Sequence, residues 1–585
     1  MQLARRLWGR MGVVGVAAAV VFAGAAAGPA GAVTGSAGRS TGPAAGGLTA
    51  AAAVSRGTVA VVGTSRMVHR PAGAPTGVRL VPLGKPATGS AAGRRSLAAR
   101  SAPRAVSAGV TAGSAGMVLH SFDGVNAVDN KSASGFDLEP PDEGLAAGNG
   151  YVVNFVNVAG IISTTAGQRL HAPFYLNTFF GEPAAANTSD PRVFYDASTR
   201  RWFATILEYG ITAKGVFTES HVDIATSTAA DLRAPWRITR IPTSNLNHAG
   251  CPCLADYPIL GVDTHNVYVS TNEFSNITAN PFNGSQLYAV SKSQLIAGAP
   301  RANVVTYQDL SAGGALAYHV QPANTYGDPG VEYLMSSLDP NSTFDTRLAV
   351  WALTDPGAVT TGGEPTLSVT ITASEPYATP PNAQTPPGFC FGSLCGKTGS
   401  PTTGVVATDF DAMQEVEYIH GNLVGALNTG VTVPGDPAER SGVAWFVVHP
   451  HVTGATIDGA TAVTRQGYIS QNGAYLLYPH VNMTDSGALA VVFGVGGPGT
   501  YLSAGYATAP AGHGFGQLHI AGAGVAPDNG FTDTTAFGGV GRWGDYSNGQ
   551  IIPGTNKVWL ATQYIPDNGD GNANWGNRVI ELQLD

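Results

Sequence analysis

One phrase recurs along this chain: a short apolar strand that an Asp often begins, a polar turn, and a second strand. It is clearest in DYPILGVDTHNVYVSTNEF (256–274) and in GRWGDYSNGQIIPGTNKVWLATQYI (541–565). Copies begin at Asp142, Asp190, Asp256, Asp328, Asp411 and Asp545, and a further copy around Tyr478 keeps the strands without the Asp. A unit that returns every 50 to 80 residues, roughly, indicates a repeat architecture and not one conventional core.

The intervals between these starts contain further strands. The segment after 256–274 holds two more strand-like runs, QLYAVSK (286–292) and NVVTYQDL (303–310). Four strands per unit is the pattern of a β-propeller, in which each blade is a twisted antiparallel sheet. The composition agrees, because 77 Gly and 38 Pro supply turns, while only 12% of the residues are charged, too few for many amphipathic helices. The copies therefore predict an all-β fold with seven blades.

The two ends of the repeat region predict how the ring closes. After the copy at Asp545 there is room for only one more strand, NRVIELQLD (577–585), so the last blade has three strands of its own. A lone strand-like run, MVLHSFDGV (117–125), precedes the first copy. If this run supplies the missing outer strand, the N- and C-terminal strands close the propeller and leave no open seam.

Charge divides the chain near Met117. Residues 1–116 contain 12 Arg, one Lys and no acidic residue, whereas residues 117–585 contain 18 basic and 39 acidic residues. This acidic balance disfavours nucleic acid as a partner of the propeller, 117–585. Residues 1–32 contain three arginines, then a short apolar run, then Ala-Gly-Ala. This is the pattern of a secretory signal peptide and not of a membrane anchor. We expect a secreted, extracellular monomer without a transmembrane anchor.

Residues 33–116 consist mainly of Ala, Gly, Ser, Pro and Arg. Such a composition buries too little apolar surface to offset chain entropy, and it predicts a disordered linker. The ten basic residues of this linker leave two interpretations open. In one interpretation the basic residues hold the protein near an anionic cell envelope. In the other, the linker is a solvated tether and these residues bind nothing.

Four cysteines in an exported protein predict two disulfides. Cys251 and Cys253 are separated by one residue, which predicts that they are too close to bridge comfortably, whereas Cys390 and Cys395 enclose a four-residue turn. Either Cys390 pairs with Cys395, the favoured bridge, or both pairs cross-link two distant loops. Zinc binding by these cysteines is the weaker alternative, because no clustered His accompanies them.

An Asp that starts the innermost strand of a blade lies near the mouth of the central channel. Most of these Asp side chains are expected to accept backbone N–H bonds in the turn that enters the strand, and a minority to face a ligand. The ligand-binding candidates at the channel mouth are Asp190, Arg192, Asp256, Tyr257, Asp411, Arg542, Asp545 and Tyr546. No catalytic residue is assigned.

Two weaker patterns concern metals. The segment DNGDGNANWGN (567–577) spaces oxygen-bearing side chains with glycines, as calcium loops do, although it matches no EF-hand and also suits a polar hairpin. The candidate calcium ligands are Asp567, Asp570, Asn572 and Asn574. His449 and His451 share one strand face and form a possible metal pair, but no third ligand stands nearby. Calcium is the one cofactor that the sequence suggests.

The blocks DPRVFYDASTRRW, DYPILGVDTHNVYVSTNEF and GRWGDYSNGQIIPGTNKVWLATQYI resemble those of secreted bacterial sialidase-like β-propeller proteins, related to the Asp-box family and mostly uncharacterised. The resemblance covers about residues 120–585 and implies fold and location. A sialidase needs three arginines that hold a carboxylate, a Tyr activated by Glu, and an Asp acid. Arg192 and Arg542 lie beside strand-starting aspartates, and Glu415, Glu417 and Tyr418 share one predicted inner strand. No Phe-Arg-Ile-Pro signature precedes the repeats, so the resemblance implies no activity.

The sequence supports one leading function and two competing ones. The leading function is a secreted recognition module whose propeller face binds a glycan or a protein, because a rigid ring carries aromatic and acidic loops without a complete catalytic set. The first alternative is a sialidase-type glycoside hydrolase with a carboxylate or Tyr-Glu pair at the channel mouth. The second is a lyase or a metal-dependent hydrolase, for which nothing marks a base or a metal.

Overall fold

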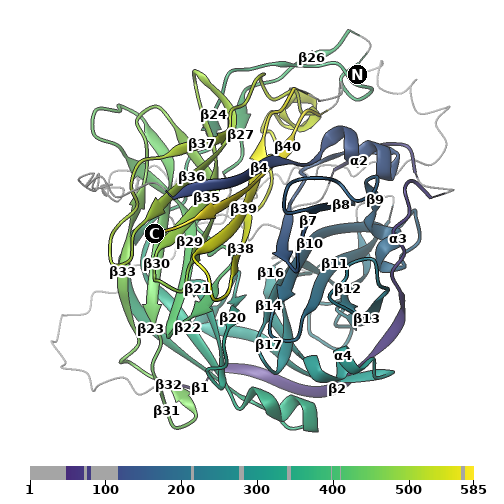
Figure 1. The fold of residues 1–585 in the computed structure, drawn as a ribbon, viewed down its shortest axis with the longest axis vertical. Helices are drawn as coiled ribbons and strands as arrows, with labels where there is room; N and C mark the ends of the chain where they lie inside the picture. Colours follow the sequence, from purple (N-terminus) through teal and green to yellow (C-terminus); the bar gives the residue numbers. More distant parts are fainter. Residues whose placement is uncertain are drawn as a thin grey trace, which may run out of the picture.

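Strands dominate the computed structural model of the chain, and the all-β prediction is confirmed (Figure 1). The structure describes residues 48–49, 51–71, 75–80, 116–212, 216–275, 282–338, 344–396, 398–408, 410–567 and 573–585. The predicted signal peptide and most of the predicted linker lie outside these residues. No helix in the described ranges is both long enough and apolar enough to cross a membrane.

Successive antiparallel meanders make up most of the molecule, as expected for propeller-type sheets. The first three are β6 (Gly144–Gly148), β7 (Tyr151–Val156), β8 (Ala159–Thr164) and β9 (Phe174–Tyr175); β10 (Asn187–Asp196), β11 (Arg201–Ile211), β12 (Phe217–Ser227) and β13 (Trp236–Pro242); and β14 (Cys253–Val262), β15 (Asn266–Ser275), β16 (Phe282–Ser291) and β17 (Arg301–Ala312). The fourth contains β19 (Gln321–Pro322), β21 (Val331–Ser337), β22 (Asp345–Thr354) and β23 (Thr366–Tyr377), with β1 (Leu48–Thr49) along β23.

The remaining meanders follow the same order from inner to outer strand. They are β28 (Glu417–Ile419), β29 (Asn422–Thr432), β30 (Glu439–His449) and β33 (Ala462–Ile469); β34 (Tyr475–Met483), β35 (Leu489–Gly497), β36 (Thr500–Ala509) and β37 (His519–Gly522); and β38 (Asn548–Ile552), β39 (Lys557–Tyr564) and β40 (Gly576–Gln583). The last of these has three strands from the C-terminal end and takes its fourth from the start of the repeat region. That strand is β4 (Met117–Asn126), which pairs antiparallel with β40, Met117 opposite Gln583, so the expected pairing of these two segments is present.

The sheets are not fully separate, because two strands join neighbouring meanders. The short strand β20 (Asn324–Tyr326) pairs in parallel with both β14 and β28. At the outer edge, β2 (Ala51–Thr64) pairs antiparallel with β13 along one half and with β17 along the other. These links merge three meanders into one continuous 15-stranded sheet.

The strand β2 corrects the prediction that residues 33–116 are a disordered linker. Residues 51–64 form a full strand, and β3 (Gly77–Leu80) pairs in parallel with β5 (Phe136–Glu139). The prediction failed because it averaged the composition over the whole segment. The local sequence AAAVSRGTVAVVGT is rich in Val and Thr, which favour strands, and its backbone groups complete two outer edges that would otherwise lack partners.

The fourth copy of the repeat was also placed wrongly. Asp328 does not begin an inner strand: it lies in an exposed turn between β20 and β21, where its carboxylate accepts from the backbone of Gly330. The inner strand of this meander begins at Gln321, one strand earlier. The error arose because Asp, used as the marker of the inner strand, is also a common turn residue.

Both cysteine pairs lie at disulfide distance. Cys390 and Cys395 pair as favoured. Cys251 and Cys253 also pair, so the prediction that they are too close to bridge is wrong. The chain turns at Pro252 and brings the two Cα atoms to 4.5 Å, within the range that disulfides span. Sulfurs joined in a disulfide carry no thiolate, and this arrangement does not support the zinc alternative.

Short elements fill connections within and between the meanders. The helical ones are α2 (Ala127–Ser134), α3 (Leu176–Phe180), α4 (Lys292–Ala297), η1 (Pro356–Thr361), η2 (Phe531–Asp533) and η3 (Thr535–Phe537). The short strands are β18 (Ala315–Leu316), β24 (Ala383–Gln384), β25 (Phe389–Cys390), β26 (Ser400–Pro401), β27 (Val405–Val406), β31 (Val452–Thr453) and β32 (Thr456–Ile457). The long connections from β23 to β28 and from β37 to β38 touch each other, as in the pairing of Val406 with Gly541.

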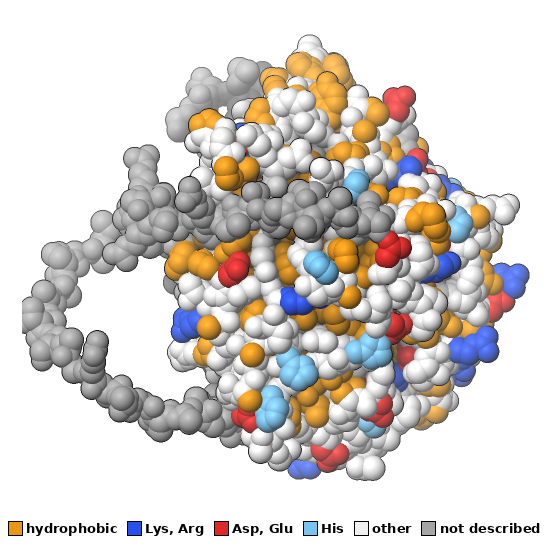
Figure 2. Space-filling model, turned by 60° about the vertical axis from the view of Figure 1, so that its left-hand side comes forward, with side chains coloured by type: hydrophobic (Ala, Val, Ile, Leu, Met, Phe, Trp, Pro, Cys, Tyr) orange, Lys and Arg blue, Asp and Glu red, His pale blue; other side chains and the backbone are white. Residues whose placement is uncertain are grey.

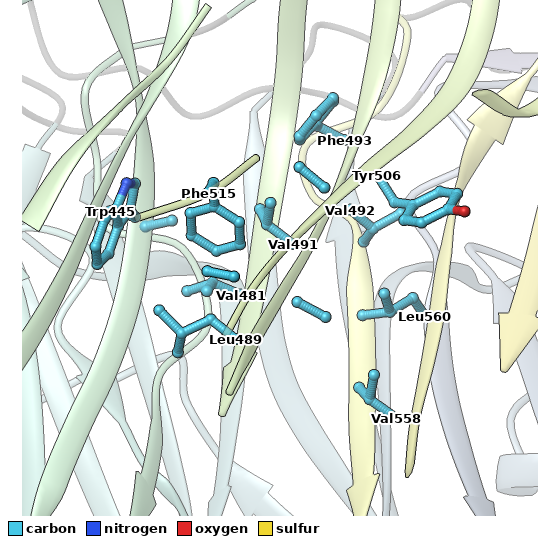
Figure 3. Close-up of a cluster of buried hydrophobic side chains, with 14 of the residues drawn as sticks. Trp445, Val481, Leu489, Val491, Val492, Phe493, Tyr506, Phe515, Val558 and Leu560 are labelled. Atoms are coloured by element: carbon cyan, nitrogen blue, oxygen red, sulfur yellow. The ribbon is translucent and has the colours of Figure 1, made fainter. Parts of the chain in front are cut away.

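The core lies between neighbouring sheets. Inner strands such as β14 and β34 are buried along their whole length, whereas the outer strand β33 is partly exposed at most positions. Figure 3 shows one of these interfaces, where Val481 and Val491 lie near Trp445 and Phe515, and Leu560 comes from the next meander. Each sheet thus covers the faces of its neighbours, which explains why the inner strands read as nearly continuous apolar runs.

The attachment of β2 can be tested with two valines of this strand. Val59 is 3% exposed and packs in the core, whereas Val62 is 50% exposed. Val59→Asp places a charge in the core and should release β2. The rate of tryptic cleavage at Arg56 should then rise by at least about tenfold, which corresponds to a fall of about 1.4 kcal/mol in the free energy of local opening. The control Val62→Asp should leave that rate nearly unchanged. Equal cleavage rates in the two variants would contradict the burial of Val59.

Candidate functional site

Five of the seven inner strands share one backbone feature, a non-glycine residue with positive φ inside the strand or two residues before it. Non-glycine residues with positive φ occur at Asp142 (φ 45°), Asp190 (54°), Tyr257 (58°), His319 (49°) and Tyr478 (51°). At Asp190, Tyr257 and Tyr478 the ladder with the next strand shifts register, which marks a β-bulge. Asp142 and His319 stand two residues before β6 and β19. The recurring phrase of the sequence therefore encodes a bend at the entry of the inner strand.

Residues at this entry position form what we call the entry set. Glu415 and Tyr546 belong to it, because they stand two residues before β28 and β38. The full set is Asp142, Asp190, Tyr257, His319, Glu415, Tyr478 and Tyr546, and each of these residues is buried. Left-handed backbone is costly for side chains this large, and such strain concentrates where function or packing requires a fixed geometry.

Arg192, the candidate on β10, lies at the centre of this set. Its Cζ is 3.3 Å from the ring centroid of Tyr546 and 5.1 Å from that of Tyr257. Its Nη1 is 3.4 Å from Oε2 of Glu415, and the whole side chain is 3% exposed. One guanidinium therefore contacts residues from three other meanders, and it combines cation–π contacts with a buried ion pair.

Three carboxylates lie together on another side of the set. Ligand oxygens of Asp142, Asp190 and Asp545 lie within 4.8 Å of one another, a spacing at which they could hold a metal ion. Arg542 donates to both oxygens of Asp545, at 3.1 and 3.0 Å, and supplies positive charge from within the chain. The structure thus brings together the candidates Asp190, Arg542 and Asp545, with the strand-starting Asp142 beside them.

Burial changes the protonation of this region. Burial, reinforced by Asp545 and only partly offset by Arg192, raises the pKa of Asp190 to about 7. Burial raises the pKa of Glu415 to about 7 against the opposing effect of Arg192 and two amides. Burial, together with Arg192, lowers the pKa of His480 to about 3. Carboxylic acids with a pKa near 7 can act as general acids or bases. A substrate would have to reach them, however, and these side chains are buried.

Two other candidates are Asp256 and Asp411. Asp256 is buried within β14, one residue before Tyr257. Asp411 is buried in the connection before β28 and accepts from Thr379 Oγ1 at 3.2 Å. Tyr257 and Tyr546, the last two candidates, do meet, with ring centroids 5.3 Å apart. Both Asp-Tyr pairs thus contribute their tyrosines to the cluster, and the second pair also contributes Asp545.

The metal patterns of the sequence receive little support. Asp570 and Asn572 lie outside the described residues, and Asn574 is engaged with the backbone of Pro527 and Asn529. Calcium binding there, with Asp567, stays a prediction. Among the described residues, His449 and His451 belong to no group with metal-binding geometry, and His451 instead pairs with Asp458 at 2.9 Å.

A groove opens elsewhere, between the meander of β28–β33 and that of β34–β37. Two adjoining cavities of about 330 and 340 Å³ share Thr464, Arg465 and Gly512 in their linings. Figure 2 brings forward the side of the molecule on which β30, β33 and β36 lie, and histidine side chains gather on it. His420 and His513, both exposed, line this groove. Volumes of this size suit small-molecule or sugar ligands.

Arg465 is the residue in this groove that sequence reasoning missed. Its guanidinium donates to the backbone oxygens of Gly487, at 3.2 Å, and His513, and its Nε has no hydrogen-bond partner. In the part of the chain that the structure describes, Arg465 forms no ion pair. Burial lowers the pKa of this guanidinium. Among the described residues, other buried or partly buried arginines that pair with carboxylates include Arg192 with Glu415, Arg240 with Asp223, Arg440 with Asp436 and Arg542 with Asp545. The partly buried Arg79, Arg201 and Arg237 instead donate to backbone oxygens, and Arg465 differs from these three in lining this groove.

No family model matches the sequence, and no curated protein matches it. Solved structures similar to the chain include an exo-β-1,3-galactanase from Clostridium thermocellum, with 10% identity, 76% of this chain and 92% of that chain covered, and a TM-score of 0.27. A Trypanosoma rangeli sialidase in complex with the inhibitor DANA has 10% identity, coverage of 68% and 55%, and a TM-score of 0.30. Drosophila Semaphorin 2a has 7% identity, coverage of 81% and 76%, and a TM-score of 0.34. Similarity this weak carries no argument about function.

The protonation of Glu415 gives a test of the buried cluster. A folded-state pKa of about 7 means that the folded protein holds a proton between about pH 4.5 and 7 that the unfolded chain releases, so this group lowers stability as pH rises through that window. Glu415→Gln cannot titrate. Its free energy of unfolding, relative to wild type, should increase by about 2 to 3 kcal/mol between about pH 5 and pH 8.

Denaturant unfolding at the two pH values measures this difference. Glu364→Gln, at an exposed position, serves as the control and should change stability little at either pH. If the stability difference between Glu415→Gln and wild type is the same at both pH values, Glu415 does not titrate in the buried environment described above.

Proposed function

We propose that this protein is a secreted recognition module built on a seven-bladed β-propeller, and that it binds an acidic glycan through the groove around Arg465. The meanders that start at β6, β10, β14, β19, β28, β34 and β38 support seven blades. The antiparallel pair of β4 and β40 supports closure of the ring between the last blade and the first. The two disulfide-distance pairs support an oxidising, extracellular location.

The uncompensated charge of Arg465 is the observation that carries the ligand class. Arg465 is partly buried, so its guanidinium has lost part of its hydration without gaining a carboxylate partner among the described residues. Two backbone carbonyls satisfy part of its donor capacity, and the buried Nε has no hydrogen-bond partner. A carboxylate or sulfate of an acidic sugar supplies both the acceptor oxygens and the negative charge, in the geometry that guanidinium groups prefer.

The rest of the groove suits a sugar. Thr464, Thr484, Ser486 and Gln466 offer hydroxyl and amide groups along its walls. Asp485 is held by His420 at 2.8 Å, which tempers its repulsion of an anion. The Cζ of Arg465 is 5.9 Å from the ring centroid of the buried Trp445, so this indole helps to fix the position of the guanidinium.

Binding by the full chain to arrays of acidic oligosaccharides and their neutral counterparts tests the proposal. We expect saturable binding of acidic glycans only. Arg465→Met keeps the apolar stem and removes the charge, and it should weaken binding by roughly 10- to 100-fold, the value of one charge-assisted hydrogen bond or pair. Arg465→Lys should give an intermediate loss, because lysine keeps the charge without the planar fork.

Arg233→Met is the matched control. Arg233 is exposed, pairs with Asp231 and lies outside the groove, so its loss should leave binding unchanged. Equal binding of neutral and acidic glycans, or undiminished binding by Arg465→Met, would refute the groove as the site. Binding of an acidic peptide in place of a glycan would keep the site and change the ligand class.

The buried cluster favours a second candidate function, sialidase-type glycoside hydrolysis. Arg192, Tyr546 and Glu415 are the residue types that such an enzyme combines, and they lie in contact. Two arginines, Arg192 and Arg542, reach this cluster among the described residues, whereas a sialidase uses three. Turnover of fluorogenic sialosides that Glu415→Gln abolishes and Arg465→Met preserves would establish this function over the recognition role.

A further inference from the structure

The first disulfide lies at an exposed loop beside a charged network. Cys251 and Cys253 are separated by Pro252 alone, and Cys253 begins β14. Cys251 is partly exposed, whereas Cys253 is 1% exposed. A disulfide that closes so short a loop constrains the unfolded chain little, so it adds less to stability than one that closes a long loop. This bridge therefore needs another explanation than stabilisation.

A histidine stands next to the exposed sulfur. Nδ1 of His248 is 3.9 Å from Sγ of Cys251. The same Nδ1 is 2.6 Å from Oε2 of Glu273, and Nε2 is 3.0 Å from Oδ2 of Asp309. Although burial opposes the charged form, these carboxylates prevail and raise the pKa of His248. The imidazole thus holds a proton within reach of Cys251.

The amide of Asn283 completes the surroundings. Its Nδ2 lies 3.7 Å from Sγ of Cys251 and 3.7 Å from Sγ of Cys253, and it donates to Glu273 at 2.9 Å. Both sulfurs therefore have a weak donor close by, which favours sulfur that carries negative charge. The second disulfide differs, because Cys390 and Cys395 are both buried against Phe531 and Phe537.

From this geometry we propose that Cys251–Pro252–Cys253 is a thiol–disulfide exchange site, in which Cys251 is the sulfur that reacts with an external dithiol and His248 transfers the proton. This activity is independent of the groove around Arg465.

The exchange is balanced as a two-electron transfer. A thiolate of the external dithiol attacks Sγ of Cys251, the Cys251–Cys253 bond breaks, and Cys253 leaves as a thiolate that takes a proton from solvent. The second thiol of the reagent then loses its proton, and its thiolate attacks the reagent's first sulfur, which is bonded to Cys251 in the mixed disulfide. Cys251 then leaves and receives a proton from Nδ1 of His248, which solvent replaces. The protein disulfide is reduced and the dithiol is oxidised to a disulfide.

The two disulfides of the chain allow an internally controlled experiment. The folded full-length protein is treated with dithiothreitol, quenched by alkylation at intervals, and analysed by peptide mass spectrometry. Cys251–Cys253 should open at least about tenfold faster than Cys390–Cys395, because its reacting sulfur is accessible. Equal rates for the two bridges, or a faster Cys390–Cys395, would overturn the proposal.

Variants of the proton relay separate a chemical role from a structural one. His248→Gln should slow the loss of the mixed disulfide at Cys251, the step in which Cys251 leaves, by about tenfold and leave Cys390–Cys395 unchanged. Asp309→Asn, which removes a partner of Nε2, should slow it less. Damage to the fold would accelerate this loss, because it exposes the sulfurs, so slowing cannot come from misfolding. An unchanged or faster loss of the mixed disulfide in both variants would exclude His248 as the proton donor.

Discussion

The buried guanidinium of Arg192 is the interaction on which the centre of this structure depends. It comes from β10, contacts Tyr257 within β14 and Tyr546 just before β38, and pairs with Glu415 just before β28. Several carboxylates enter the same buried volume, and like charges in a low-dielectric interior repel strongly. A single fixed cation, with Arg542 beside Asp545, offsets part of that repulsion and holds the strand entries in register with one another.

The backbone at these entries shows the same compromise. A bulge bends the inner strands β10, β14 and β34, and positive φ at Asp190, Tyr257 and Tyr478 accompanies it. Such strain persists only where the surroundings over-determine the conformation. Here the surroundings are the neighbouring sheets, whose apolar faces bury both sides of the inner strands. Packing between sheets thus fixes the geometry that the local chain disfavours.

Sequence reasoning found the repeated units and their order, because alternation and turns are local properties. It also found the pairing of the first and last strands of the repeat region, because the last unit is one strand short. It aligned the copies on Asp, whereas the equivalent position in the structure is Tyr257 in one copy and Asp190 in another. Equivalence is set by where the bulge falls, and several residue types can occupy a bulge.

Other errors have different physical causes. Strand β2 was missed because its partners, β13 and β17, lie far from it in the sequence. The average composition of a segment does not show that a distant sheet edge can pair with it. Arg465 was missed because its significance lies in the carboxylate it lacks, and a sequence does not show which charges meet in space. The bridge between Cys251 and Cys253 was judged from spacing alone, without the turn at Pro252.

The pairing of β4 with β40 has a consequence for how the chain reaches its native state. Met117 finds its partner only when Gln583, almost the last residue, is available. During synthesis the first sheet can form early, but the sheet that joins the ends waits for the whole repeat region to be made. Contacts of such large sequence separation slow folding and leave strand edges open in the interval. Until β40 is made, β4 must therefore be kept from pairing with strands of other chains, whereas in the folded protein β40 covers it.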